Sequence, residues 1–251
     1  MTLSHDVAGD GPALVLLHSG VCDRRMWDPQ WAALLDAGYR VIRCDFRGFG
    51  RSPMPDRPYN NADDVADLLG HLGVERAALV GSSFGGRVAL EVAARWPDTV
   101  TTLALLCSGS PELVPGPALR SFAEQEDALL SAGDVDAAVE LNLATFLGPE
   151  ADGATRENVR LMQRHAFDVQ MAGGEEFGQI AAEIDLSAIT ATCLAVSGGR
   201  DLPEFREIAA GLPGLLPRAR HVELPWAAHL PSLERPAEVT ALLLDFLRAS
   251  D

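Results

Sequence analysis

The sequence predicts an α/β fold in which a mostly parallel, twisted sheet is covered by helices on both faces. Short apolar segments bounded by turn residues alternate with segments of helical periodicity up to about residue 106, and the alternation resumes near residue 192. Strands and helices that alternate in this way form βαβ units, whose strands pair in parallel. Between the two stretches only helical periodicity is present, which predicts a helical insertion.

Most expected strands are short, mainly apolar runs, and each expected helix repeats its apolar residues every three to four positions. One helix stops before Pro97, and Pro236 begins the last one. Strands are expected over residues 13–17, 39–44, 77–81, 100–106, 192–196 and 220–224. Helices are expected over residues 27–37, 61–72, 84–96, 119–131, 135–146, 155–171, 204–210 and 236–248.

We expect residues 1–111 and 187–251 to form the α/β core. Residues 112–186 are expected to form a helical lid, because this block interrupts the alternation and its breaks contain Gly or Pro. Ligands of open α/β sheets bind outside the carboxyl ends of the strands. The insertion is therefore expected to lie over that edge of the sheet.

Composition excludes several classes of function. The chain has 251 residues, 47% apolar and 22% charged, which is ordinary for a globular protein. Its formal net charge of −16 argues against nucleic acid and anionic membranes as partners, since basic patches bind both. All 20 basic residues are arginine. Without lysine, Schiff-base chemistry, a lysine-bound pyridoxal phosphate and a phosphate-binding P-loop are excluded.

The amino-terminal segment Met1–Gly11 lacks the positive charges of a signal peptide, and the apolar run Ala13–Leu17 is too short for its hydrophobic region. No stretch approaches the roughly 20 apolar residues of a membrane span. We therefore expect a cytoplasmic protein, while no pattern indicates its oligomeric state. The cysteines lack a metal-binding or redox spacing and are expected to be buried free thiols: Cys22, Cys44, Cys107 and Cys193.

The segment Gly81–Gly85 matches the pattern G-x-S-x-G, with Ser83 as the central serine. It follows an apolar strand and opens a helix, which is the setting of a strained elbow that presents a nucleophile. Glycines two positions before and after the serine keep side chains from colliding with neighbouring backbone. The alternative is a helix start rich in Gly and Ser without a catalytic role. The context favours Ser83 as a nucleophile.

A serine hydroxyl needs a base, and His229 is the best candidate. It follows the last expected strand by a short loop, so it can reach the same sheet edge as Ser83. Asp201 follows the strand over residues 192–196 and is expected to orient the imidazole. His18 directly follows a strand and is assigned to the loop that is expected to form the oxyanion hole. The remaining histidines are expected to be structural or solvated: His5, His71, His165 and His221.

An oxyanion hole needs two preset N–H donors. The amide of Phe84, directly after the serine, is one. The second is expected from the loop after the first apolar strand, with the Gly20 amide preferred and the Val21 amide as the alternative. Asp45 also ends a strand but precedes the serine, so we interpret Asp45 and Arg47 as a pair that braces a loop.

At this point the chain resembles the α/β-hydrolase superfamily, over nearly its whole length and in the family's order of motifs. Within it, the chain looks most like small lidded esterases and 3-oxoadipate enol-lactonases. The resemblance implies a helical lid over the nucleophile. It is carried by the segments His18–Gly20, Arg24–Gln30, Asp45–Ser52, Gly81–Gly86, Gly198–Asp201 and Ala228–Pro236.

Two features depart from the family pattern. Ser19 stands where glycine is commoner, which leaves the second oxyanion donor open, and the amino-terminal antiparallel hairpin looks shortened. Haloalkane dehalogenases and epoxide hydrolases of this fold use an Asp nucleophile and dienelactone hydrolases use Cys, so Ser83 argues against all three. The resemblance implies no metal or organic cofactor. No spaced cluster of His and carboxylates suggests a metal either.

The predicted function is hydrolysis of a small carboxylic ester or lactone through an acyl-enzyme. A second hypothesis keeps the triad but performs C–C bond hydrolysis or acyl transfer. A third is a binding protein on a hydrolase fold, which the complete triad disfavours. Ester hydrolysis is therefore the leading hypothesis.

Candidate substrate contacts are Val21, Trp226 and Arg164. Arg164 and its neighbours Arg160 and His165 either bind a substrate carboxylate or form a solvated helix surface. A second set is assigned either to the pocket wall or to the core: Met26, Trp27, Phe46 and Trp226.

Overall fold

The computed structural model describes residues 2–111, 114–173 and 177–250, so parts of the expected lid, residues 112–113 and 174–176, lie outside it. Its centre is a seven-stranded sheet in the order β1-β3-β2-β4-β5-β6-β7. Only β1 runs antiparallel, beside β3, and the other neighbours are parallel as predicted. The strands are β1 (His5–Ala8), β2 (Ala13–Leu17), β3 (Arg40–Cys44), β4 (Ala77–Ser82), β5 (Val100–Leu106), β6 (Thr192–Gly198) and β7 (Ala219–Leu224).

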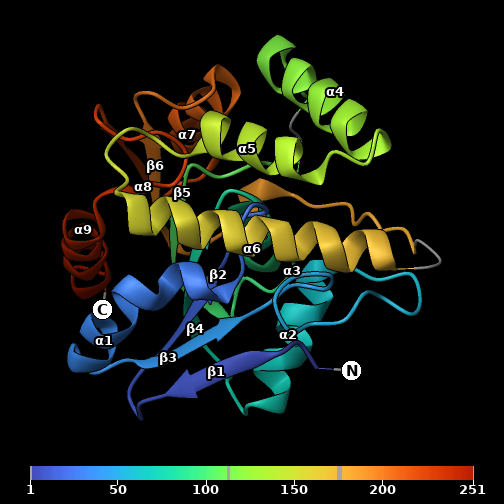
Figure 1. Ribbon diagram of the computed structural model, residues 1–251. Helices are drawn as coiled ribbons and strands as arrows, with labels where there is room; N and C mark the ends of the chain where they lie inside the picture. The colour runs from blue at the N-terminus through green and yellow to red at the C-terminus, as the bar shows by residue number, and fades with distance from the viewer. Residues whose placement is uncertain (1, 112–113, 174–176, 251) are drawn as a thin grey trace.

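Helices cover both faces of this sheet (Figure 1). Side chains of a strand alternate between its faces, so β2 contributes Leu14 and Leu16 to one core and Val15 and Leu17 to the other. α1 (Asp28–Asp36) and α9 (Pro236–Arg248) pack on the first core. The second core is covered by α2 (Asn61–His71), α3 (Phe84–Arg95) and part of α7 (Pro203–Leu215).

The order of the strands determines where a ligand can bind. From β2 the chain moves outward to β3 and then returns to β4 on the other side of β2. In open α/β sheets, the crevice at such a reversal, outside the carboxyl ends of the strands, is where ligands bind. The loops after β2 and β4 flank this crevice, and they carry Gly20 and Ser83.

Three helices lie between β5 and β6, namely α4 (Pro117–Ser131), α5 (Val135–Phe146) and α6 (Gly153–Ala172). α4 packs on α5 and α5 on α6, and in Figure 1 the three helices lie over the sheet. α6 contacts core loops, since His165 Nε2 lies 2.8 Å from the Gly50 carbonyl oxygen and Gln170 Nε2 donates to the Gly48 carbonyl at 3.3 Å. No residue of α4 is buried.

The structure differs from the predicted elements in several places. β1 was not among the expected strands, although a shortened antiparallel segment was expected at the amino terminus, and it is a short edge strand without a buried residue. The predicted helix over residues 27–37 is divided into a 3₁₀ turn, η1 (Arg24–Trp27), and α1. The helix predicted to end at residue 210 continues to Leu215 despite Pro213, because Leu212 packs into the second core.

Short elements complete the fold, namely η2 (Leu186–Ala188) and α8 (Pro231–Glu234). All four cysteines are free and buried, which confirms that prediction. Across the described part of the chain, no helix combines the length and apolar character needed to cross a membrane.

Candidate active site

Ser83 lies on a sharp turn between β4 and α3. Its backbone has φ 52° and ψ −112°, a left-handed conformation that a residue with a side chain rarely adopts. The flanking glycines allow the turn to pack: a Cβ on Gly81 would lie 2.5 Å from the Gly85 carbonyl oxygen, and one on Gly85 would lie 2.3 Å from that of Leu17. The steric explanation of the G-x-S-x-G pattern is thus visible in the contacts.

The structure brings the three predicted triad residues together. His229 Nε2 lies 2.7 Å from Ser83 Oγ, and His229 Nδ1 lies 2.8 Å from Asp201 Oδ2. Each residue stands in a loop at the carboxyl end of a different strand: Ser83 after β4, Asp201 after β6 and His229 after β7. Parallel pairing of these strands is what places the three loops at one edge.

The chemistry of the three side chains decides which atom donates in each hydrogen bond. An ionised carboxylate can only accept, so the His229 Nδ1–H donates to Asp201 and the Ser83 hydroxyl donates to the bare Nε2. Asp201 is fixed by a second bond, because its Oδ1 accepts from the Leu202 backbone at 2.7 Å. The Phe205 and Phe146 rings pack on the imidazole at centroid distances of 4.2 and 4.9 Å. This arrangement can pass a proton from Ser83 to His229.

Two backbone amides beside Ser83 are free to act as donors. The N–H groups of Gly20 and Phe84 have no hydrogen-bond partner among the residues that the structure describes, whereas Val21 N donates weakly to Ser19 Oγ at 3.5 Å. Gly20 and Phe84 are also neighbours, since a Cβ on Gly20 would lie 3.6 Å from Phe84 Cβ. These contacts favour Gly20 over Val21 as the second oxyanion donor.

His18 holds the loop that carries Gly20. Its Nδ1–H donates to the Ser19 carbonyl at 2.8 Å, and its Nε2 accepts from the Phe46 backbone at 3.0 Å. Full burial lowers the pKa of the His18 imidazole, with the Ser19 carbonyl and the charges of Asp45 and Asp23 acting in the opposite direction. The neutral ring therefore braces the loop.

The predicted pairing of Asp45 with Arg47 is wrong. Asp45 instead pairs with Arg24 at 3.0 Å and also accepts from the Arg51 backbone, so it braces a loop with different partners. Arg47 forms a bidentate pair with Asp64 of α2, with N–O distances of 2.7 and 2.6 Å. The hydrogen bond to Asp64 raises the pKa of the Arg47 guanidinium.

A cleft of about 490 Å³ opens beside the two free amides. Gly20 and Phe84 form part of its wall, and apolar side chains form much of the rest, notably Phe49 and Met54. Its polar lining includes Arg47, whose charge Asp64 compensates, together with Tyr59, Gln170 and Gln179. The volume is within the range of small-molecule sites.

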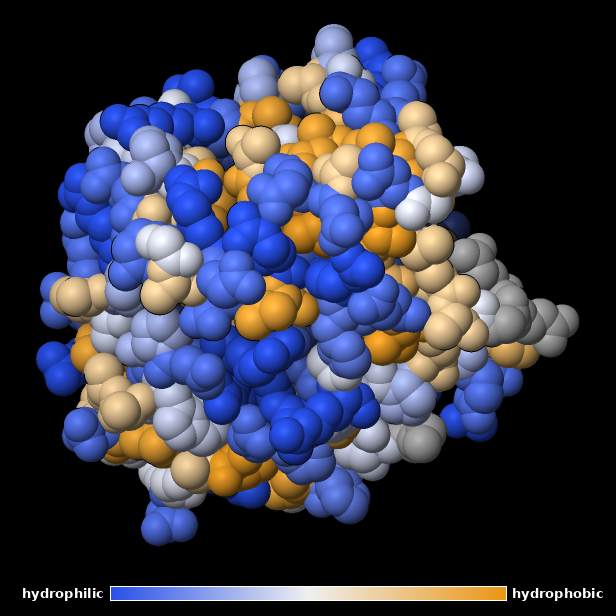
Figure 2. Space-filling model, viewed as in Figure 1, coloured by the Kyte–Doolittle hydropathy of each residue, from blue (hydrophilic) through white to orange (hydrophobic). Residues whose placement is uncertain are grey.

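The residues proposed as substrate contacts lie elsewhere. Trp226 Nε1 donates to Glu238 at 2.9 Å, Arg164 pairs with Asp136 and Asp168, and neither these two nor Val21 lines the cleft. The outward face of α6 is thus a solvated, charged surface, and Figure 2 shows mainly hydrophilic surface over the face on which α6 lies. The second set belongs to the core, since three of its members are fully buried: Met26, Trp27 and Phe46.

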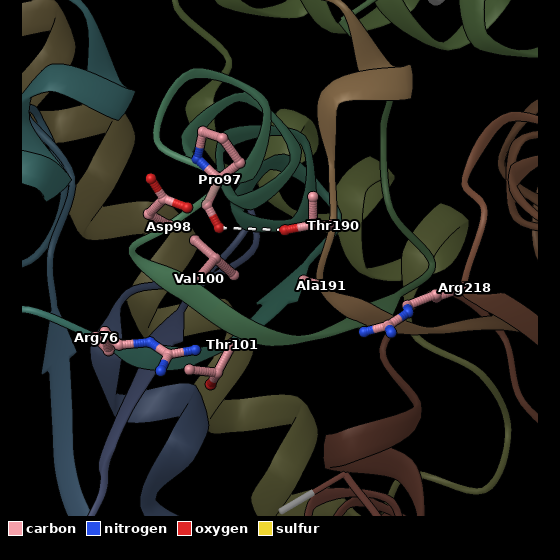
Figure 3. Close-up of a pocket in the computed structure, with 8 residues that line it drawn as sticks. All are labelled: Arg76, Pro97, Asp98, Val100, Thr101, Thr190, Ala191 and Arg218. Atoms are coloured by element: carbon pink, nitrogen blue, oxygen red, sulfur yellow. Dashed lines mark hydrogen bonds between the residues drawn. The ribbon is translucent and has the colours of Figure 1, made fainter.

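A second cleft, about 450 Å³, opens at the amino ends of β4, β5 and β6 (Figure 3). Its charged side chains are Arg76, Asp98 and Arg218, and its hydroxyls are Thr101 and Thr190. It contains no histidine or cysteine and lies at the opposite edge of the sheet from Ser83. It is therefore not a candidate for the predicted chemistry.

Cys107 is a buried thiol that the sequence did not connect with the site. Within the described residues, Cys107, Asp201 and His229 are the only group whose donor atoms lie close enough to hold a metal ion. Both His229 nitrogens are already engaged, and burial followed by the charge of Asp201 raises the pKa of the Cys107 thiol well above its usual value. A protonated thiol is a poor metal ligand, so this donor set does not fit a metal.

Glu234 was missed as well. Its buried carboxylate contacts the loop that carries His229, accepting from the Ala228 backbone at 3.1 Å. The signal in the sequence was an acidic residue within the otherwise apolar or hydroxylic run that follows His229. Burial raises the pKa of the Glu234 carboxyl, while backbone N–H bonds act in the opposite direction.

The fold and the Ser–His–Asp constellation define the class of α/β hydrolases, and comparison with known proteins agrees. A family model described as "Alpha/beta hydrolase family" matches residues 14–242. The chain belongs to the α/β hydrolase family.

Several relatives match the chain over nearly its whole length. A curated protein of Variovorax paradoxus, named putative carbamate hydrolase RutD, is 36% identical, covering 98% of this chain and 96% of its own. A solved hydrolase from Pseudomonas aeruginosa is 29% identical with a TM-score of 0.78, covering 97% and 93%. The enol-lactonase from Burkholderia xenovorans is 26% identical with a TM-score of 0.78, covering 98% and 96%. The resemblance to the α/β-hydrolase superfamily is thereby confirmed, and an enol-lactonase is among the structural neighbours.

Proposed function

We propose that the protein is a serine hydrolase that cleaves a small carboxylic ester or lactone through an acyl-enzyme. The observation that supports this most strongly is the continuous contact from Ser83 through His229 to Asp201, with distances of 2.7 and 2.8 Å. The free Gly20 and Phe84 amides beside a cleft of about 490 Å³ add a place for the substrate carbonyl.

In the proposed reaction, Ser83 Oγ attacks the carbonyl carbon while His229 Nε2 takes the hydroxyl proton. The Gly20 and Phe84 amides stabilise the oxyanion, and Asp201 stabilises the imidazolium. When the tetrahedral intermediate collapses, the bond to the leaving alcohol breaks and His229 returns the proton to it. Water then attacks the acyl-enzyme by the same steps and releases the acid.

The name of the Variovorax relative makes carbamates the second substrate class to test, since they too present an acyl carbon to a serine. C–C bond hydrolysis and acyl transfer with the same triad remain the alternative chemistry.

Residues 112–186 are proposed as the lid, because α5 and α6 contact the His229 loop and the Gly48–Gly50 loop. The cytoplasmic location remains a prediction of the sequence.

The test is release of p-nitrophenol from short p-nitrophenyl esters, with wild type beside Ser83→Ala. We expect turnover by the wild type and a loss of at least about 1,000-fold in the variant, because residual rates over water come only from the oxyanion hole and binding. Circular dichroism checks that the variant is folded. Activity retained in folded Ser83→Ala would refute the proposed nucleophile.

A further inference from the structure

The loop that carries His229 is held by backbone contacts to several other segments. The His229 backbone N–H donates to the Phe146 carbonyl at 3.2 Å, where α5 ends in the inserted segment. The Ala228 carbonyl faces Cys107 Sγ at 3.6 Å, and the Ala227 carbonyl accepts from the Arg200 backbone at 2.9 Å. The backbone beside the imidazole therefore has little freedom.

Glu234 provides the remaining contacts of this loop. Its Oε1 accepts from the backbone N–H groups of Ala228 and Leu230, at 3.1 and 3.3 Å, which are the residues on either side of His229. Its Oε2 lies 3.1 Å from the same Ala228 nitrogen. The carboxylate also lies against Gly148, two residues after α5 ends, and the Gly148 backbone N–H acts to lower its pKa. One buried side chain thus joins both neighbours of His229 to the inserted segment.

The space around Gly148 shows how close this contact is. A Cβ on Gly148 would lie 2.1 Å from Glu234 Oε2 and 2.8 Å from its Cδ, so no larger residue fits while the carboxylate keeps its place. Glutamine at position 234 would offer one acceptor oxygen and turn an NH₂ donor toward backbone N–H groups. The shape and the donor pattern both require a carboxylate here.

We propose that Glu234 is a positioning residue that fixes the His229 imidazole in line between Asp201 and Ser83 by clamping the backbone on both sides of it to the inserted segment. The inference rests on the proposed function and adds to it. A small tilt of the ring would lengthen the hydrogen bond to Ser83, and catalysis is sensitive to displacements of about 1 Å. The segment that follows α5 therefore helps to position His229.

The experiment compares Glu234→Gln and Gly148→Ala with wild type. The second variant keeps the carboxyl group but displaces it. Ester turnover is measured as kcat and KM separately, well below each variant's thermal unfolding midpoint. We expect kcat to fall at least 10-fold in both variants and KM to stay within threefold, because the ring is misplaced while the cleft is unchanged.

The matched control is Glu204→Gln. Glu204 is also buried and also accepts backbone N–H groups of the insertion, those of Ala118 and Leu119 at 3.1 Å, but among the described residues none of its hydrogen bonds reaches the His229 loop. Its kcat is expected to stay within twofold of wild type. Lower unfolding midpoints with unchanged kcat in Glu234→Gln and Gly148→Ala would overturn the proposal, and so would an equal loss of kcat in the control.

Labelling by a fluorophosphonate separates this inference from the function on which it rests. The reagent reacts with an activated serine without requiring a particular substrate, and its rate is followed by intact mass. Slow labelling of the two variants beside fast labelling of wild type supports the positioning role, and equal rates contradict it. A wild type that neither labels nor turns over any ester contradicts the proposed function, and the inference then fails with it.

Discussion

The sheet edge that carries the triad and the inserted helices α4–α6 differ in how closely their side chains are surrounded. At the edge, a Cβ on Gly85 would meet backbone at 2.3 Å, whereas Gly153 at the start of α6 has nothing within 4 Å. Arg47 at the edge pairs in a buried site, with its side chain 7% exposed, whereas Arg164 on α6 is 41% exposed. Packing at the edge is therefore tighter than on the outward faces of the inserted helices.

One part of the insertion does not follow this division. The corner from Phe146 to Gly148 contacts the His229 loop through the Phe146 ring, its carbonyl and the Gly148 backbone. The insertion therefore has a fixed corner beside the base, whereas α4 has no buried residue and is held mainly at its start, by Glu204. Under the proposed function, we expect the edge to set the chemistry and the inserted helices to influence substrate choice.

The largest effect is expected from Asp201→Asn. The side chain keeps its shape, but its amide favours the wrong tautomer of His229, so the Nε2 no longer accepts the Ser83 proton. We expect kcat to fall about 1,000-fold or more with the fold intact. A steady-state assay beside a urea unfolding curve checks both parts, and a loss below 10-fold would argue against the triad.

The next largest effect is the difference in stability loss between Arg47→Ala and Arg164→Ala. Removing Arg47 leaves Asp64 buried without its partner, which costs about 3–5 kcal/mol of unfolding free energy. Removing Arg164 breaks only exposed ion pairs, so we expect a much smaller loss of unfolding free energy. Chemical denaturation measures both.

The same variant tests the earlier assignment of Arg164 to the substrate. The ratio of turnover for acidic and neutral esters is expected to be unchanged in Arg164→Ala. A fall in that ratio would show that Arg164 on α6 binds a substrate carboxylate. The outward face of the insertion would then take part in substrate binding.

A matched pair of glycines sharpens the comparison further. Gly85→Ala places a methyl group against the Leu17 and His18 carbonyls, and we expect a loss of about 1–3 kcal/mol or more in unfolding free energy. Gly153→Ala meets open space in a helix, and a gain of about 0.5–1 kcal/mol is expected. Equal effects in the two variants would contradict the difference in packing.

Acid is expected to lower the unfolding free energy of the protein by protonating His18 in the unfolded chain. Because burial holds the folded pKa of His18 below its usual value of about 6.5, the unfolded chain binds a proton that the fold excludes. The unfolding free energy that depends on the neutral His18 ring is therefore fully present above about pH 6.5. It is lost as the pH falls, by at most about 1.4 kcal/mol per pH unit. Denaturation curves between pH 5 and 7.5 should be flatter for His18→Gln than for wild type, and parallel curves would contradict the assignment.

The sequence predicted the elbow and the order of the triad residues because both depend on local rules. A strand that runs into Gly-x-Ser-x-Gly and a helix permits few conformations, and parallel strands bring their following loops to one edge. The sheet and most helices follow from periodicity in the same way. The catalytic roles of these residues remain predictions that the variants above test.

The remaining features depend on contacts between distant segments. Arg47 was paired with the wrong carboxylate because nothing local distinguishes Asp45 from Asp64 of α2. The cleft wall combines Met54 and Gln170, which only tertiary packing brings together. Glu234 lay inside a motif that already carried the resemblance, but its role appears only once the backbone of Gly148 is placed beside it.

The most direct test of the central claim is to find which residue a fluorophosphonate modifies. The account predicts one adduct per chain, mapped to the peptide that carries Ser83, absent in Ser83→Ala and at least 100-fold slower in His229→Ala. An adduct on another residue, or labelling of Ser83 at an unchanged rate without the imidazole, would contradict the claim that His229 activates Ser83 as the nucleophile.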